Sequence, residues 1–192
     1  MLIQLIAQHP SAIGTVLKNT PVWVWGLFGT LLALGLSQVR TRSVSAIRMT
    51  LMPLAMTGFS LWGTGSAFGK SPLFPWVLAV WLAGAALTLA LVGSRAAPAG
   101  TGYNPASRSF TVPGSLVPLG LILGIFLTKY VVGVDLAMQP TLAGDGQYTL
   151  VVGGLYGLFS GIFAGRAVRL WRLALRSNAS SSASATIPAL NA

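Results

Sequence analysis

The feature that most constrains this chain is a series of long apolar stretches. A helix that crosses a bilayer needs about 20 mainly apolar residues. Stretches near this length occupy residues 21–38, 47–65, 73–92, 115–134 and 149–166. Only 7% of the 192 residues are charged, whereas an ordinary soluble domain has about 25%. This number of charges is too small to supply the polar surface of a soluble fold. The sequence therefore predicts an all-α polytopic membrane protein with about five transmembrane helices.

The segments outside these stretches divide the chain into three parts. Residues 1–19 contain apolar clusters interrupted by Gln8-His9-Pro10, without a basic start, and we expect an interfacial segment on the membrane, with a sixth span as the alternative. Residues 20–176 form the bundle and its basic helical extension. Residues 177–192 are rich in Ser and Ala, which predicts a disordered tail. The Gly/Pro/Ser-rich residues 94–114 predict a flexible connection.

The distribution of basic residues predicts an orientation. Nine of the twelve are arginines, and in a five-span protein all nine fall on one side: between the first two spans, between the third and fourth, and after the fifth. The positive-inside rule places that side in the cytoplasm. The N-terminus is then outside and the C-terminus is cytoplasmic. The Ala/Gly/Leu/Arg-heavy composition without cysteine suggests a bacterium, and we expect the protein in its inner (cytoplasmic) membrane.

Glycines recur every four residues in the fifth span, which places them on one face of a helix. Small residues let helices approach closely in lipid, so this strip predicts helix packing, inside the monomer or between copies. A glycine-lined pore helix is a third reading. The fourth span has a shorter version. The packing residues are Gly153, Gly157, Gly161 and Gly165, with Gly120 and Gly124.

Lys129 is the most informative charge because it lies within the fourth span. A charge inside a membrane is costly and marks a candidate functional residue. Its ammonium either extends to the outer headgroups or turns inward to an anion, a carbonyl or Asp135. Lys129 and Asp135 are therefore the candidate ligand or partner residues.

The arginines after the fifth span recur every three or four residues and alternate with apolar side chains. This pattern predicts a basic amphipathic helix on the inner headgroups that anchors the topology and attracts anionic lipid. No nucleic-acid-binding module accompanies the charges, so we expect no nucleic acid partner. The residues concerned are Arg166, Arg169, Arg172 and Arg176.

Residue types needed for most catalysis are scarce. The chain has no Cys, no Glu, two Asp and one His, which leaves few candidates for a nucleophile or a metal ligand. We expect no enzyme, no metal and no cofactor. A membrane enzyme that used Asp135, Asp145 and His9 is the weakest hypothesis.

Several stretches resemble a family of small, uncharacterised bacterial multi-pass inner-membrane proteins. They are TPVWVW at residues 20–25, LMPL at 51–54, FTVPGSLVPLGLILGIFLTKYVVGV at 110–134 and SGIFAGR at 160–166. The resemblance covers most of residues 20–176, and the longer N-terminal segment departs from it. It implies a multi-pass membrane protein of unknown function and supplies no catalytic residues.

These observations favour an accessory or structural membrane protein. Its partners would be the lipid bilayer and either itself or another membrane protein. The alternative is a small transporter or channel that uses Lys129 and the Gly-lined fifth helix.

Overall fold

The computed structural model describes residues 12–186, and most of these residues are helical. Two short 3₁₀ turns, Ser37–Val39 and Pro140–Gly144, and three short strands connect the helices. The helices are α2 (Ala12–Asn19), α3 (Val22–Leu36), α4 (Ala46–Phe68), α5 (Phe74–Gly93), α6 (Val117–Met138) and α7 (Gly146–Thr186). The predicted all-α class is confirmed. The predicted interfacial segment lies largely outside the described residues, apart from α2.

Prolines occupy helix starts, where a missing N–H costs little. Pro21 immediately precedes α3, while Pro75 and Pro118 lie in the first turns of α5 and α6. Hydroxyl groups inside the helices bond to carbonyls of the preceding turn, as Thr64 does to Ser60 O at 2.8 Å and Thr128 to Gly124 O at 2.7 Å. Such bonds satisfy polar groups within a helix, as a hydrocarbon environment requires.

Four helices are long and apolar enough to cross a membrane: residues Val22–Val39, Phe74–Gly93, Val117–Met138 and Gly146–Ser177. The sequence-based count of about five is therefore one too high by this criterion. The helix that does not qualify is α4, which covers the predicted span 47–65 and has 23 residues. It contains Thr, Ser and Gly at many positions and Arg48 near its start, and these residues lower its mean hydropathy.

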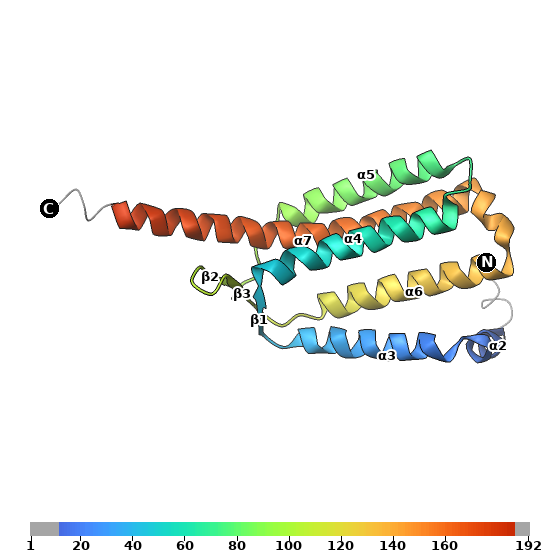
Figure 1. Ribbon diagram of the computed structural model, residues 1–192, viewed down its shortest axis with the longest axis horizontal. Coiled ribbons are helices and arrows are strands. Elements are labelled where there is room, and N and C mark those ends of the chain that lie inside the picture. Colours follow the sequence, from blue (N-terminus) through green and yellow to red (C-terminus); the bar gives the residue numbers. More distant parts are fainter. Residues whose placement is uncertain (1–11, 187–192) are drawn as a thin grey trace.

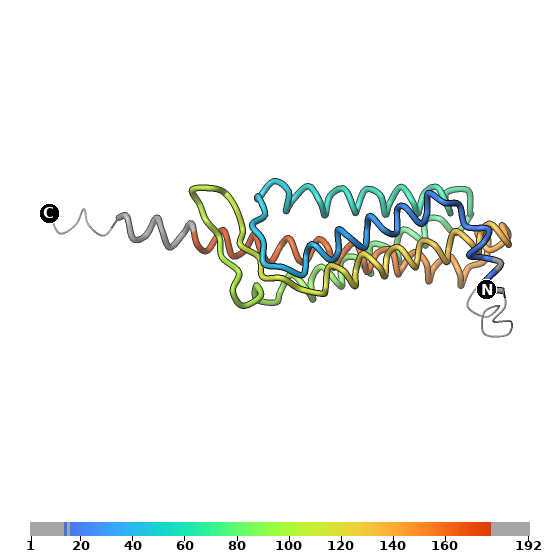
Figure 2. Tube along the Cα trace, turned by 90° about the horizontal axis from the view of Figure 1, so that it is seen from below, coloured from blue at the N-terminus to red at the C-terminus, as the bar shows by residue number. Residues whose placement is uncertain are grey.

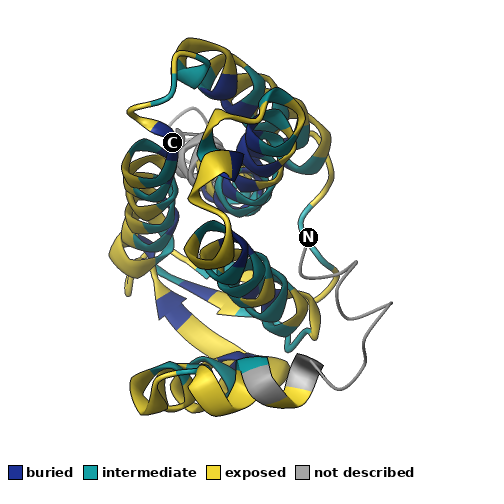
Figure 3. Cartoon of the chain, turned by 90° about the vertical axis from the view of Figure 1, so that its right-hand side faces the viewer, coloured by how far each residue is buried: buried dark blue, intermediate teal, exposed yellow. Residues whose placement is uncertain are grey.

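The long helices run side by side in two groups (Figure 1). One group contains α4, α5 and α7, and α7 packs extensively on α5 and less on α4. The other contains α3 and α6, which pack on each other. Direct contact between α6 and α7 is limited. We call these groups the α4–α5–α7 layer and the α3–α6 layer. Figure 3, viewed along the helices, shows exposed residues on their outward faces.

The main core lies where α4, α5, α6 and α7 approach one another. Ser60 on α4 connects three of these helices, because its hydroxyl donates to Tyr156 O at 3.3 Å and accepts from Trp81 Nε1 at 3.1 Å. Buried side chains surround this junction: Phe68, Val77, Trp81, Val132, Val152 and Tyr156.

The connection at residues 94–114 forms part of a three-stranded antiparallel sheet instead of the predicted flexible loop. β2 (Gly102–Asn104) and β3 (Ser109–Val112) form a hairpin, and β1 (Arg42–Ser45) pairs with the other edge of β3. Figure 2 shows this connection beside α7. Phe110 is fully buried against Leu170 and Ala174 of α7, which explains why the segment is ordered.

Helix α7 has 41 residues and continues past Arg176 to Thr186. The sequence analysis assigned residues 177–192 to a disordered tail, so the helix enters the first ten residues of that segment. No Gly or Pro interrupts residues 177–186, and Ala and Ser permit helix to continue. Residues 187–192 lie outside the described part of the chain.

Candidate functional site

A large apolar cavity, partly open to the outside, lies between the two helix layers. Its volume is about 1330 Å³, above the range of about 300–1,000 Å³ usual for small-molecule sites. Side chains from α2, α3, α4, α6 and α7 line it, and nearly all of them are aliphatic or aromatic. The cavity exists because α6 and α7 touch at few points, so that each layer has an apolar face turned toward the other.

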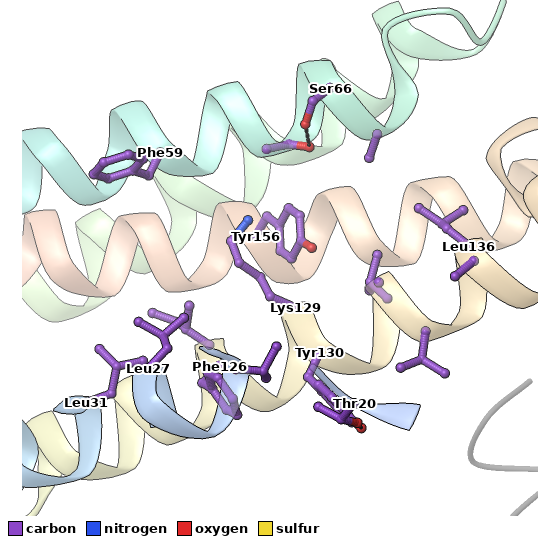
Figure 4. A pocket seen from close by; sticks show the side chains of 18 of the residues that line it. Thr20, Leu27, Leu31, Phe59, Ser66, Phe126, Lys129, Tyr130, Leu136 and Tyr156 are labelled. Carbon is purple, nitrogen blue, oxygen red and sulfur yellow. Dashed lines mark hydrogen bonds between the residues drawn. The ribbon is translucent and has the colours of Figure 1, made fainter. Parts of the chain in front are cut away.

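Lys129 is the one charged side chain among the described residues that line this cavity. It extends from α6 across the gap toward α7 (Figure 4), and its Nζ lies 4.4 Å from the centre of the Tyr156 ring. A Cβ added at Gly63 of α4 would lie 2.5 Å from Nζ. Of the two readings of the sequence, the inward orientation is therefore the one observed. The ammonium reaches the middle of the gap instead of extending toward the headgroups.

Lys129 lies near the middle of α6 (Val117–Met138). At 1.5 Å per residue it lies about 18 Å from the start of α6 and about 14 Å from its end. A cation over an aromatic face is stabilised by about 1–2 kcal/mol when it is poorly hydrated. No ion pair of Lys129 with a carboxylate occurs within residues 12–186, and the side chain stays exposed to the gap between the layers.

Asp135, the other candidate residue, has different surroundings. It is 3% exposed and lies near Tyr148 of α7. Lys129 and Asp135 are thus directed to two tyrosines of α7 that are two turns apart. Asp145 lies just before α7, where its carboxylate accepts from Tyr148 N at 2.7 Å. His9 lies outside the described residues.

Hydroxyl groups add a few polar positions to the cavity wall. Thr20 Oγ1 and Tyr130 OH are 2.6 Å apart and join the start of α3 to α6 (Figure 4). A side pocket of about 50 Å³ next to Lys129 adds Ser60 and Ser160 to the lining. An apolar cavity with one cation and few hydroxyls suits a ligand that is largely apolar and has one anionic end.

The glycine strip of α7 lies against α5 within the monomer. A Cβ at Gly153 would lie 2.7 Å from Val77 Cγ1, and one at Gly157 would collide with the Trp81 carbonyl. Gly161 meets Ala85 and Thr88 in the same way. Gly165 approaches Val92 and Gly93. Since this face is turned away from the cavity, these glycines do not line a pore.

The glycines of α6 have separate environments. Gly124 faces the Phe159 ring at 3.4 Å, whereas no described atom lies within 4 Å of a Cβ at Gly120. The arginines Arg166, Arg169, Arg172 and Arg176 lie on α7 at the end of the bundle that carries the sheet.

Sequence reasoning missed the residues that line the cavity together with Lys129. Tyr156, Tyr130 and Thr20 come from three different parts of the chain, and no local pattern pairs them with a lysine. Aromatic residues are common in membrane helices, so a tyrosine in the fifth span carried no specific signal. Only the packing of the two layers brings these groups together.

A family described as a family of unknown function (DUF6622) matches residues 1–181 of the chain. No curated protein and no solved structure matches the chain. The family match covers the helical bundle, the sheet and the long C-terminal helix, and agrees with the predicted resemblance to an uncharacterised family.

Proposed function

This chain belongs to the DUF6622 family of unknown function, and we propose that it is an integral membrane protein that binds an amphiphile with an anionic head group between its two helix layers. The observation that carries this proposal is the inward-facing Lys129 in an apolar cavity of about 1330 Å³. The head group would lie at the ammonium, and the tail would occupy the apolar space beside it.

Charge and desolvation support an anionic head group. Lys129 is exposed to the gap between the layers, and hydrocarbon in that gap would leave its ammonium poorly hydrated. A carboxylate or phosphate would restore a charge-assisted hydrogen bond, and such a bond contributes about 1.5–3 kcal/mol.

The apolar lining supports a long hydrocarbon tail. Phe59 on α4 lies across the cavity from Leu27 and Leu31 on α3 (Figure 4), and Trp62 of α4 also lines the cavity. Cavity walls without partner atoms lose dispersion contacts, and an alkyl chain would supply them. A membrane provides such chains at high local concentration, so an amphiphile can reach the cavity from the bilayer itself.

We further propose that α4 crosses the membrane with the other long helices, which gives five crossings. It packs on α7, and α3 and α5 on either side of it in sequence are both long enough to span. Ser60 of α4 bonds to α7 and α5, and Thr64 is fully buried. With five crossings, the arginine-rich end lies in the cytoplasm of a bacterial inner membrane, and the N-terminus lies outside.

Lys129→Met tests the role of the cation. The protein is purified in detergent, and the binding of palmitate and of hexadecanol is measured by native mass spectrometry. We expect Lys129→Met to weaken palmitate binding at least tenfold, because about 1.5–3 kcal/mol of charge-assisted bonding is lost. Hexadecanol, which has the same tail without the charge, should bind both proteins equally.

The matched control is Lys70→Met, which removes the same charge from an exposed turn. It should leave palmitate binding unchanged. Equal palmitate binding by wild type, Lys129→Met and Lys70→Met would contradict the proposal. So would a loss of hexadecanol binding as large as that of palmitate, because the substitution would then have closed the cavity.

The sequence-based alternatives are affected differently by the structure. The Gly-lined face of α7 packs on α5, so the cavity, and not this face, would be the pathway of a transporter or channel. Movement of a fluorescent fatty acid across vesicles that contain the protein would favour transport over simple binding. An accessory role that requires assembly with itself or another membrane protein stays a prediction. The glycine strip, which motivated it, packs on α5 inside the monomer.

A further inference from the structure

A second group of side chains gathers at the end of the bundle that carries the sheet. It contains arginines from three segments that are distant in sequence: Arg42 and Arg48 on β1 and the first turn of α4, Arg95 after α5, and Arg166 and Arg169 on α7. Arg166 interacts electrostatically with Arg42 and Arg169, as Arg42 does with Arg48 and Arg169 with Arg95. We call these five residues the arginine cluster.

The arginine cluster concentrates like charges without a carboxylate nearby. The two aspartates of the chain, Asp135 and Asp145, lie at the opposite end of the bundle, near the end of α6 and the start of α7. Burial, and then the positive charge of Arg48, lowers the pKa of Arg42 from its ordinary value. Like charges this close disfavour one another, so an anion bound among them would stabilise the folded protein.

The described hydrogen bonds in this region use neutral acceptors and few of the available donors. Arg42 Nη2 donates to Gln38 Oε1 at 2.8 Å, and Arg172 Nη1 donates to Gly93 O at 2.9 Å. Arg169 Nε is shielded from solvent and has no acceptor among the described residues. A guanidinium has five N–H donors, so the cluster retains many donors for an anion with several oxygens.

The arginine cluster lies at the depth where the apolar helices end. Helix α5 ends at Gly93, where an added Cβ would lie 3.5 Å from Val168 Cγ1 of α7. Arg166 and Arg169 flank that contact in sequence, so they are level with the end of the α5 span. One turn further along α7, the ring of Trp171 donates to Thr50 Oγ1 at 3.0 Å. This is the depth of lipid head groups.

We propose that the arginine cluster binds the phosphate monoester group of a lipid head group, held between Arg42, Arg166 and Arg169. Planar guanidinium groups match phosphate oxygens in a bidentate geometry. A monoester has three free oxygens and close to two negative charges, whereas a phosphodiester has two free oxygens and one charge. Arg166 interacts electrostatically with both Arg42 and Arg169, and three neighbouring positive charges favour the more highly charged monoester.

A fixed phosphate site depends on particular arginines, whereas a general basic surface depends only on total charge. The sheet holds Arg42 in place through its pairing with β3, in register with Val112. Phe110 of the same strand packs on α7 through Trp171, with ring centroids 6.1 Å apart. Arg176 lies further along α7 and is exposed. Arg176 would attract any anionic membrane but would not contact a phosphate held by the cluster.

The test compares lipids and single-arginine variants of the full chain. The protein is placed in phosphatidylcholine nanodiscs that contain either a phosphatidic acid or a phosphatidylglycerol, at matched total negative charge. Lipids that remain bound after transfer to detergent are counted by native mass spectrometry. We expect wild type to retain phosphatidic acid about tenfold over phosphatidylglycerol. Arg42→Gln and Arg166→Gln should lose this preference, and Arg176→Gln should keep it.

The proposal is overturned if wild type retains both lipids equally, or if Arg176→Gln loses the preference as fully as Arg166→Gln. The first result needs no variant, so it stands even if a substitution prevents folding. Inorganic phosphate is added as a competitor in a separate arm. Displacement of the lipid only at high millimolar phosphate supports a lipid head group, whereas full displacement at micromolar phosphate assigns the site to free phosphate and overturns the lipid.

Discussion

At the scale of single residues, two phenylalanines of α4 have different environments: one lies in the core and the other in the cavity wall. Phe68 is 0% exposed within the core, whereas Phe59 is 63% exposed and lines the cavity. We expect Phe68→Ala to lower the free energy of unfolding by about 3 kcal/mol, because truncation leaves a void that the core cannot fill. Phe59→Ala should cost under about 1 kcal/mol. Unfolding in detergent followed by circular dichroism measures both, and equal losses would contradict this division.

Individual residues also show which features of the structure could be predicted from the sequence. Lys129 could be singled out because a charge inside an apolar span is rare, but its partner Tyr156 could not. Trp23, Trp62 and Trp76 are more than 60% exposed, as rings at a lipid interface would be. Trp81 looks the same in sequence, yet it is 4% exposed and bonded to Ser60, because burial depends on neighbours from other helices.

At the scale of helices, the glycine strip sets the distance between α5 and α7. A methyl group at Gly157 would collide with the Trp81 carbonyl, which belongs to the backbone and cannot rotate away. Gly157→Ala should therefore separate the helices and destabilise the protein by about 2 kcal/mol. Gly120→Ala is the matched control, since no described atom lies within 4 Å of its added Cβ. It should be neutral or stabilise α6 by up to about 1 kcal/mol through helix propensity. A comparison of their melting temperatures decides, and a Gly157→Ala variant as stable as Gly120→Ala would exclude this role.

Helices were easier to predict than the sheet for a physical reason. Long apolar runs and prolines at helix starts are local signals, and they located all five long helices from α3 to α7. The strands have three or four residues each, too short for an alternating pattern to emerge. Their order depends on Phe110 packing against α7, a contact between distant segments. The cavity was missed likewise, because it arises from how two layers meet.

At the scale of the whole molecule, the proposed ligands lie at two depths. Lys129 is near the middle of α6, and the arginine cluster is at the sheet end, where the apolar spans stop. An anion in the middle of a bilayer needs a protein cation to stabilise it, whereas head groups surround the cluster in any membrane. The two sites therefore make separate demands: occupancy of the cavity should depend on Lys129 alone, and lipid preference at the rim on several arginines.

The orientation of the molecule gives the last prediction. The chain contains no cysteine, so single cysteines can report on each side without background. Lys70→Cys lies in the exposed turn between α4 and α5, and Ser107→Cys lies in the exposed turn between β2 and β3. With five crossings and a cytoplasmic C-terminus, a membrane-impermeant maleimide should label the first in intact cells. It should label the second only after the membrane is opened. Because the two turns are joined by α5 alone, labelling of both in intact cells would mean that α5 does not cross, and the reverse pattern would invert the topology.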